Sequence, residues 1–302
     1  MTSQNTFCGR VAIVGKPNVG KSTLINRLLE EPISIATHKS HTTRHCILGV
    51  KTVHHTQLVI IDTPGIHVKA ERTLNRKMNR AAHQALQGAN MVLWLTDRLH
   101  LEADDERTAN CLKDLSIPII WCMNKIDRLK NSSEIETHLA LMQTQYPWIK
   151  TFIPISARTG AEVATLESLI LSLCPQAPHM FPNDVLTDRS PLFMASETIR
   201  AKLFKYTHQE VPYATFVTID RFKAQTTRVD IQATLWVERP SQKAIVIGKK
   251  GENIKRIGID ARKTLCRLLD NTVHLKLWVG VQKDWSDDNH TIDTQNLPGD
   301  NT

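Results

Sequence analysis

The sequence predicts an α/β domain built on a mostly parallel sheet, followed by a smaller domain that mixes helices with alternating strands. Three observations lead to this prediction. Apolar runs of strand length alternate with helical stretches through the first half, prolines cluster between residues 175 and 182, and the strands beyond them alternate polar with apolar residues. Buried strands that alternate with helices are typical of βαβ units. The 302 residues are enough for two domains.

Six strands are expected in the first domain, which spans residues 7–175. The second and third are nearly contiguous, which indicates a hairpin and therefore one antiparallel edge strand. Helices are expected from Lys21 to Leu29 and from Val163 to Leu173. The predicted strands lie near residues 10–15, 46–53, 56–63, 90–97, 117–124 and 151–157.

Prolines mark the end of the first domain, because they cannot continue the preceding helix. Residues 176–189 are therefore expected to form a linker, and residues 190–284 a second domain. The polar, acidic residues 285–302 are expected to be a disordered tail. Within the second domain the pattern predicts a helix at 191–207 and strands at 214–224, 229–237 and 273–281.

Composition narrows the class of protein. With 41% hydrophobic residues and no apolar run near 18 residues, we expect a soluble protein without a transmembrane span. The first ten residues lack a basic flank followed by an apolar core, which argues against a signal peptide. Six scattered cysteines without a C-x-x-C favour reduced thiols in a cytoplasmic protein over disulfides or a zinc site. We expect a monomer.

The most informative motif directly follows the apolar run Val11–Val14. Residues Gly15–Ser22 read G-x-x-x-x-G-K-S, and strand, glycine-rich turn and helix in succession are the context of a phosphate cradle. Lys21 would neutralise the β- and γ-phosphates, and Ser22 would hold Mg²⁺. The predicted phosphate-binding residues are Gly15, Lys16, Pro17, Asn18, Val19, Gly20, Lys21, Ser22 and Thr23.

A second motif predicts which base is bound. Asn124, Lys125, Ile126 and Asp127 follow the apolar run at 117–123. The Asp127 carboxylate can accept two N–H bonds from guanine N1 and N2, whereas adenine has no such donor pair. Asn124 and Lys125 would brace the base and its loop, and Ser156-Ala157 would close over the base.

The third motif predicts a γ-phosphate sensor. Asp62, Thr63, Pro64 and Gly65 follow the apolar run at 58–61, where Asp62 would reach Mg²⁺ through a water and Gly65 would offer its N–H to the γ-phosphate. In the polar stretch 37–45, either Thr42 or Thr43 could give the metal a hydroxyl, and Thr43 is our choice. Loops whose order depends on one phosphate are the basis of a switch.

These motifs, in this order and spacing, resemble a translation-factor-class GTPase, and G-K-P-N-V-G-K-S with T-T-R and D-T-P-G resembles the Era family. The resemblance covers about residues 7–284. It implies an α/β P-loop GTPase domain with helices on both faces of the sheet, followed by an α+β type II KH domain that binds RNA. It also implies a role at the 3′ end of 16S rRNA in biogenesis of the small (30S) ribosomal subunit, with peripheral association with the inner membrane.

Ile66 follows the third motif, where Ras-type enzymes carry the glutamine that orients the attacking water. Isoleucine cannot do this, so we expect slow intrinsic hydrolysis of GTP. In related GTPases the asparagine that matches Asn18 helps to bind a potassium ion in place of an arginine finger. For Asn18 itself, an equal alternative is a purely structural role, in which this loop residue bonds its own backbone.

The second domain contains a G-x-x-G between two apolar helical stretches, where a KH domain clamps a nucleic-acid backbone. Between Arg239 and Arg267 nine lysines or arginines stand against two acids, whereas the whole chain carries a net charge of +8. This local surplus predicts an RNA-binding face, with a solvated helix face as the alternative. The apolar Ile247, Ile254 and Ile257 could line a groove for single-stranded bases, but each is interpreted as a core position. The predicted RNA-binding residues are Ile247, Gly248, Lys249, Lys250, Gly251, Lys255, Arg256, Arg262 and Lys263.

Other classes of protein fit less well. A P-loop kinase or ATPase has no need of Asn124–Asp127, and an RNA-binding module with a dead nucleotide site would lose Lys21 or Asp62. Tandem ribosome-assembly GTPases carry two P-loops, whereas this chain has one. A GTPase of another ribosome-assembly or RNA-modification branch, with a different RNA target, remains the alternative. Two departures from the family are His41 in place of glutamine and the acidic tail.

Overall fold

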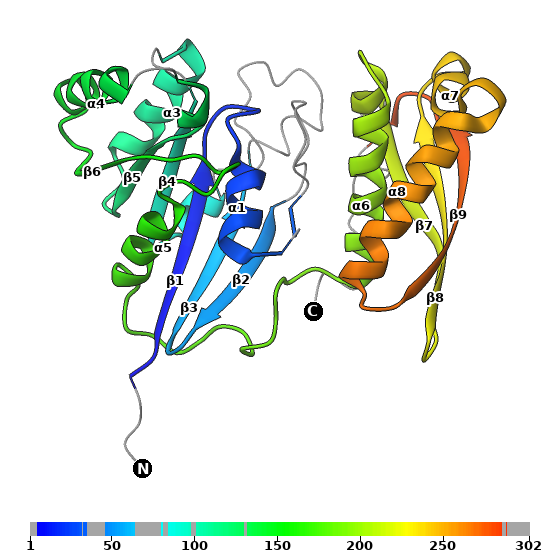
Figure 1. Ribbon diagram of the computed structural model, residues 1–302, viewed down its shortest axis with the longest axis horizontal. Coiled ribbons are helices and arrows are strands. Elements are labelled where there is room, and N and C mark those ends of the chain that lie inside the picture. Colours follow the sequence, from blue (N-terminus) through cyan, green and yellow to red (C-terminus); the bar gives the residue numbers. More distant parts are fainter. Residues whose placement is uncertain are drawn as a thin grey trace. The chain divides into compact units, whose positions relative to one another are not determined.

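The computed structural model describes residues 5–31, 33–34, 46–63, 80, 84–97, 101–129, 132–285 and 288. These residues divide into two compact units, one that ends at Asp188 and one that begins at Arg189. Each unit has its own sheet and its own core, and each is described by itself below (Figure 1).

The first unit is built on a six-stranded sheet in the order β2-β3-β1-β4-β5-β6. All neighbouring strands are parallel except β2, which pairs antiparallel with β3 at one edge. The predicted sheet is therefore confirmed, including its antiparallel edge. The strands are β1 (Phe7–Val14), β2 (Ile47–Val53), β3 (Thr56–Asp62), β4 (Met91–Thr96), β5 (Ile119–Met123) and β6 (Thr151–Pro154).

Helices cover both faces of this sheet. On one face, Leu112 of α3 and Met142 of α4 pack in one cluster with Trp94 and Trp121 of the sheet. On the other face α1 lies against β2 and β3 and contacts α5. Because both faces are covered, β4 and β5 are buried along their whole length and read as continuous apolar runs. The helices are α1 (Lys21–Leu29), α3 (Ala103–Lys113), η1 (Ile126–Arg128), α4 (Ser132–Gln145) and α5 (Val163–Ser172).

The segment expected to be a linker is hydrogen-bonded to the first unit over most of its length. Gln57, fully buried at the start of β3, accepts from Met180 N at 2.8 Å and Phe181 N at 3.0 Å, and donates to Phe181 O at 2.8 Å. Further along, Leu186 O accepts from Val50 N on the edge strand β2 at 2.8 Å. The segment therefore covers the outer side of β2, where its N–H and C=O groups have no neighbouring strand.

The second unit is a three-stranded sheet in the order β7-β8-β9, with two long helices packed on one face. Strands β7 and β8 are antiparallel, and β8 and β9 are parallel. Alternate residues of β8 are buried, as expected for a sheet covered on one face. The elements are α6 (Pro191–Tyr206), η2 (Val211–Ala214), β7 (Thr215–Ala224), β8 (Arg228–Val237), α7 (Pro240–Ile247), η3 (Lys249–Gly251), α8 (Glu252–Leu268) and β9 (Thr272–Val281).

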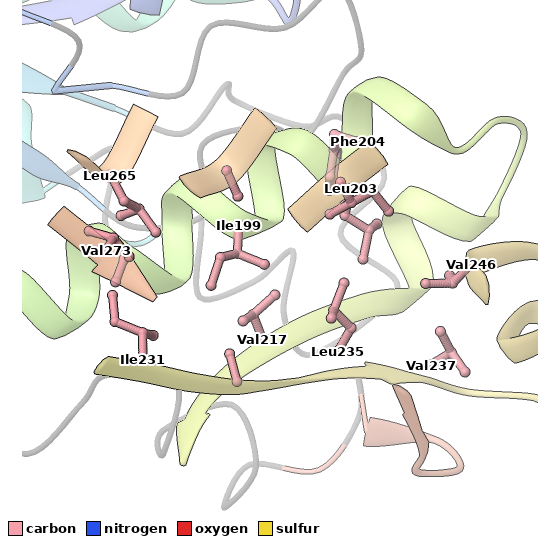
Figure 2. Packing of buried hydrophobic residues seen from close by; sticks show 14 of the residues in the cluster. Ile199, Leu203, Phe204, Val217, Ile231, Leu235, Val237, Val246, Leu265 and Val273 are labelled. Carbon is pink, nitrogen blue, oxygen red and sulfur yellow. The ribbon is translucent and has the colours of Figure 1, made fainter. Parts of the chain in front are cut away.

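The core of the second unit lies between these helices and the sheet. Figure 2 shows Ile199 and Leu203 of α6 pointing toward Val217, Ile231 and Leu235 of the strands. On α8 the buried residues Ile257, Ala261 and Leu265 recur every four positions, which leaves the opposite side of that helix free for charged residues. This spacing explains why one helix can supply both core and basic face.

The predicted start of the disordered tail is wrong. The tail was expected from residue 285, but the side chain of Trp285 is fully buried. Its ring lies 4.8 Å from that of Phe216, and its Nε1 donates to Ala214 O at 3.2 Å. The packed part of the second unit therefore includes Trp285, because an indole gains both apolar burial and a hydrogen bond there. Among the described residues, no helix is long and apolar enough to cross a membrane.

Candidate functional site

The glycine-rich turn connects β1 to α1 at the carboxyl edge of the sheet. Gly20 has a φ of +105° and is the N-cap of α1. A Cβ at Gly20 would overlap the side-chain amide of Asn124, so glycine is required by contact as well as by conformation. Within the described residues no side chain caps α1, which leaves its first N–H groups for an anion.

Lys21, in the first turn of α1, is buried. Its Nζ donates to Gly15 O at 2.8 Å and to Lys16 O at 3.0 Å, so the ammonium is held across the turn. Burial lowers the pKa of Lys21 from 10.5 to about 8, although the nearby charge of Asp62 opposes the shift. A phosphate bound there would favour the charged ammonium and so raise the pKa of Lys21 again.

Ser22 and Asp62 lie together beside this lysine. Ser22 Oγ donates to Asp62 Oδ2 at 3.2 Å, and Asp62 is fully buried at the end of β3. Next to it, Thr63 Oγ1 donates to Ile13 O at 2.6 Å. A hydroxyl and a carboxylate are oxygen donors of the kind that Mg²⁺ prefers, so these two side chains fit a magnesium ion. The predicted Thr43, Pro64, Gly65 and Ile66, with Thr42 and the polar stretch around it, lie outside the described residues.

Asn124 joins three segments of the first unit. Its Nδ2 donates to Val19 O at 2.7 Å, and its Oδ1 accepts from Ala157 N at 2.9 Å. The side chain is buried, so both bonds are shielded from water. The structure therefore brings together the glycine-rich turn and the two segments that the sequence assigns to the base.

Asp127 has hydrogen-bond donors on both carboxylate oxygens. Ser156 Oγ donates to Oδ1 at 2.5 Å, and Arg158 Nη2 donates to Oδ2 at 2.5 Å. The bond from Ser156, and then the charge of Arg158, lower the pKa of Asp127 against the opposing effect of burial. Asp127 is thus held as a carboxylate, the form that accepts two N–H bonds. Ser156 and Ala157 are both buried beside it.

The other predicted nucleotide residues surround these. Val19 is fully buried, Pro17 and Thr23 are half-buried, and Ile126 N donates to Ile155 O at 3.3 Å. The side chain of Asn18 is exposed, and its backbone has a φ of +65°.

Sequence reasoning missed two arginines at this site. Arg27 on α1 donates from Nη2 to Arg158 O at 2.6 Å and from Nε to Ala157 O at 3.4 Å, so it holds the segment over Asp127. Arg158 itself contacts Asp127. The adjacency of Arg158 to Ser156-Ala157 was a signal available in the sequence, whereas nothing near Arg27 pointed to a partner 131 residues away.

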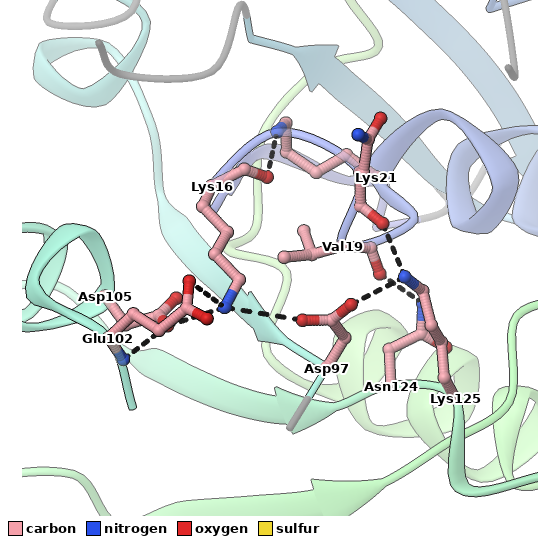
Figure 3. Close-up of polar contacts among 9 residues, drawn as sticks. Lys16, Val19, Lys21, Asp97, Glu102, Asp105, Asn124 and Lys125 are labelled. Carbon is pink, nitrogen blue, oxygen red and sulfur yellow. Dashed lines mark hydrogen bonds and ion pairs between the residues drawn. The ribbon is translucent and has the colours of Figure 1, made fainter. Parts of the chain in front are cut away.

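A cluster of charges, largely buried except for Glu102, lies beside the glycine-rich turn (Figure 3). Lys16 Nζ is 3.0 Å from Asp105 Oδ2, 3.2 Å from Glu102 Oε2 and 3.5 Å from Asp97 Oδ1. Burial would lower the pKa of Lys16, but its carboxylate partners, Asp105 first, raise it above its ordinary value. Lys125 Nζ donates to Asp97 Oδ2 and to Asn18 O, each at 2.6 Å. None of the three carboxylates was singled out by the sequence.

In the second unit, the predicted clamp is the turn between α7 and α8. Gly248 has a φ of +74°, and a Cβ there would approach the Asn253 side chain to 2.7 Å. At Gly251, by contrast, a Cβ would meet nothing within 4 Å. The turn is therefore packed on one side and open on the other. Lys249 and Lys250, between the glycines, are exposed.

The predicted basic residues of α8 are all on its solvent side. Lys255, Arg256, Arg262 and Lys263 are exposed, and the Arg256 guanidinium lies 5.0 Å over the Tyr206 ring. Arg262 lies about 16 Å along the helix from Gly251. The apolar Ile257 is fully buried, which confirms its core position, whereas Ile247 and Ile254 are half-buried beside the clamp.

Family models match both units. A family described as "50S ribosome-binding GTPase" matches residues 10–125, and the KH domain matches residues 210–286. The chain is 44% identical over 293 residues to the GTPase Era of Glaesserella parasuis, with 97% of each chain covered. It is 43% identical over 287 residues to the GTPase Era of Coxiella burnetii, covering 95% of this chain and 97% of that one.

Two solved structures are similar to this chain over both of its units. One is Era in complex with MgGDPNP and nucleotides 1506–1542 of 16S ribosomal RNA, with a TM-score of 0.91 and 36% identity. The other is an Aquifex aeolicus Era variant bound to GDP·AlF4⁻, with a TM-score of 0.92 and 36% identity. In both cases 95% of this chain and 98% of the other are covered. The predicted pairing of a P-loop GTPase domain with a type II KH domain is thus confirmed, and the chain belongs to the Era family of GTPases.

Proposed function

We propose that this chain is a GTP-hydrolysing switch whose second unit binds the 3′ end of 16S rRNA during maturation of the 30S subunit. One observation carries the proposal. The phosphate turn, the Ser22–Asp62 pair and Asp127 meet at one edge of a sheet, in a chain that also carries an open G-x-x-G turn beside a basic helix. The structural neighbour that holds both MgGDPNP and 16S nucleotides supports the choice of both ligands.

The nucleotide would lie across the carboxyl edge of the first sheet. The N–H groups of the turn and the Lys21 ammonium would bind the phosphates, while Asp127 would accept from guanine N1 and N2. Ser22 and Asp62 would hold Mg²⁺, with Thr43 as the second hydroxyl. The ion that these residues would hold would supply positive charge against the phosphates.

Hydrolysis needs a group that compensates for Ile66. Because the Asn18 carbonyl accepts from Lys125 and its side chain is exposed, that side chain is free to face the phosphates. We propose that it helps to bind a potassium ion. GTP hydrolysis should be faster in potassium than in sodium, and Asn18→Ala should abolish the difference. Equal wild-type rates in the two salts would contradict the potassium role.

The RNA would contact the clamp and then follow α8. Lys249 and Lys250 would attract backbone phosphates at the open side of the turn, where Gly251 allows close approach. Arg262 and Lys263 lie too far along α8 for the same few nucleotides, so we propose that a longer RNA uses them together with Lys255 and Arg256.

The test is a crosslinking map of bound RNA combined with a hydrolysis assay. Full-length protein is crosslinked to small-subunit ribosomal RNA, and crosslinks to the 3′ end should exceed those elsewhere and disappear in Lys249→Asp/Lys250→Asp. Phosphate release from GTP is measured in parallel. Crosslinks concentrated on another RNA would favour the alternative, a GTPase with a different RNA target, and no release from GTP would reject the enzymatic part.

We also propose that the protein acts in the cytoplasm with peripheral association with the inner membrane. All six cysteines are free thiols, which fits a reducing compartment. Cell fractionation tests this proposal: the protein should divide between the ribosomal and membrane fractions, and high salt should release the membrane-bound part.

A further inference from the structure

We infer that Asp97 is a positioning residue that acts through Lys125. It holds the base-reading loop, residues 124–127, in register with the glycine-rich turn, residues 15–22. The inference rests on the guanine-nucleotide function proposed above. It concerns the carboxylate that, in the described part of the chain, contacts a lysine from each of the two nucleotide loops.

The order of the strands explains why Asp97 reaches both loops. Asp97 directly follows β4, and β4 lies between β1 and β5 in the sheet. The glycine-rich turn follows β1, and the base-reading loop follows β5. Carboxyl ends of neighbouring parallel strands meet at one edge, so a side chain after the middle strand faces loops on both sides. The bond from Asn124 N to Thr96 O, 2.7 Å long, holds the two strand ends together.

The two lysines depend on Asp97 to different extents. Lys16 is also paired with Asp105 at 3.0 Å and with Glu102 at 3.2 Å. For Lys125, Asp97 at 2.6 Å is the one carboxylate partner that the described residues show, and its second bond goes to Asn18 O. Loss of the Asp97 charge should therefore disturb Lys125 much more than Lys16.

The backbone of Lys125 also needs support from the contacts around it. Its φ is +67°, a left-handed conformation that a residue with a side chain adopts only when its surroundings impose it. Asp127 lies two residues further, in the short helix η1 that Lys125 caps. If the ammonium lost its charged partner, the loop could relax and carry the Asp127 carboxylate away from the position that meets both guanine donors.

The side chains involved are shielded, which makes the contact worth measuring. The Asp97 side chain is 13% exposed and that of Lys125 20% exposed, so water replaces the ion pair only in part. A hydrogen bond to a charged group in such surroundings contributes about tenfold to a hundredfold to an equilibrium constant.

The experiment compares GDP with IDP, which lacks the exocyclic amino group of guanine, on full-length protein. Asp97→Asn should weaken GDP binding about tenfold or more, and should weaken IDP binding less, because IDP cannot use both oxygens of Asp127. The ratio of the two affinities therefore falls. The matched control is Glu102→Gln, which removes a carboxylate that contacts Lys16; its GDP affinity and ratio should stay close to wild type.

A double-mutant cycle tests whether Asp97 acts through Lys125. In a Lys125→Met background, Asp97→Asn should add little further loss of GDP affinity, since the two side chains form one contact. Thermal unfolding of each variant shows how much protein is folded at the assay temperature. Asp97→Glu replaces Asp97→Asn if that variant does not fold. It keeps the charge, but its longer side chain displaces the carboxylate from its 2.6 Å contact with Lys125, so its ratio should also fall.

The possible outcomes distinguish a failure of this inference from a failure of the proposed guanine-nucleotide function on which it rests. Wild-type protein that fails to bind GDP would reject the guanine-nucleotide function itself. Wild-type protein that binds GDP, together with an unchanged affinity ratio in folded Asp97→Asn or Asp97→Glu, would overturn the positioning role alone. Full additivity of the loss with Lys125→Met would do the same.

Discussion

The glycine-rich turn of the first unit and the clamp of the second unit both precede a helix, but they are held in different ways. The glycine-rich turn is fixed by side chains from distant segments, such as Asn124 on Val19 O and Lys125 on Asn18 O. The clamp is fixed mainly by its own backbone, with Gly251 N donating to Gly248 O at 3.1 Å. A site that must read one base needs fixed partners, whereas a backbone clamp needs an accessible surface.

The largest expected effect is on base recognition, where the nucleotide site depends on a single carboxylate. Asp127→Asn should lower GTP affinity about a hundredfold, because two N–H bonds to a charged acceptor are lost or weakened. It should favour xanthosine triphosphate, whose edge presents an acceptor where guanine presents a donor. A nucleotide titration measures both affinities. RNA affinity is the control, and unchanged GTP affinity would contradict the role of Asp127.

The clamp should respond to charge without any effect on the nucleotide site. Lys249→Asp/Lys250→Asp replaces attraction of RNA phosphates by repulsion while leaving the core of the second unit intact, so RNA affinity should fall about tenfold or more and its salt dependence should flatten. Filter binding across salt concentrations measures this, with GTP affinity as the internal control.

A matched variant makes this comparison sharper. Lys223→Asp/Lys276→Asp makes the same change of charge at two exposed lysines on the sheet of the same unit. If this variant loses as much RNA affinity as the clamp variant, the general charge of the unit, and not the clamp, carries the binding.

The pH dependence of nucleotide binding follows from the burial of Lys21. Its pKa of about 8 lies below the unfolded value of 10.5, so the folded, free protein releases this proton first as the pH rises. The phosphates bind the ammonium form, so GDP affinity should fall above pH 8, by up to about tenfold per pH unit. Binding measured from pH 7 to 9 in wild type and in Lys21→Met tests this, and the variant should show no such fall.

The same shift predicts how the stability of the free protein changes with pH. Below pH 8 the folded state must keep a buried ammonium, and the unfolded state holds it at less cost. The free energy of unfolding should therefore rise as the pH increases from about 8 to 10.5, because the unfolded chain binds more protons in that window. Denaturant titrations at pH 7.5 and 9.5 measure this rise in the free energy of unfolding. It should be larger in wild type than in Lys21→Met.

The smallest effect is expected at Arg158. Its side chain is 71% exposed, so its pair with Asp127 is largely screened by water. Arg158→Ala should weaken GDP binding less than about threefold. Arg128→Ala is the matched control, since it removes an equal, exposed charge next to Asp127 in the chain. A loss of tenfold or more in Arg158→Ala would show that the nucleotide site extends further onto its surface than the buried contacts indicate.

Local spacing in the sequence was sufficient for much of this protein. The glycine-rich turn, Asp62 and Asp127 each follow an apolar strand, and parallel strands bring their carboxyl ends to one edge, so the sheet and the meeting of the motifs could be predicted. In α8 the sequence likewise predicted that Ile257 is a core position, and it is fully buried. Such patterns can be recognised in the sequence because they depend on residues that are close along the chain.

Only the tertiary structure identified Asp97, Arg27, the bonds of Gln57 to the linker, and the burial of Trp285. Each of these residues has an ordinary sequence environment, and its partner lies far along the chain: Lys125 is 28 residues from Asp97, and Phe181 is 124 from Gln57. A carboxylate after a strand or a tryptophan near the chain's end has no periodicity to predict its contact. The packing of segments decides which groups lose water, and a buried polar group must then find whatever partner the fold has placed beside it.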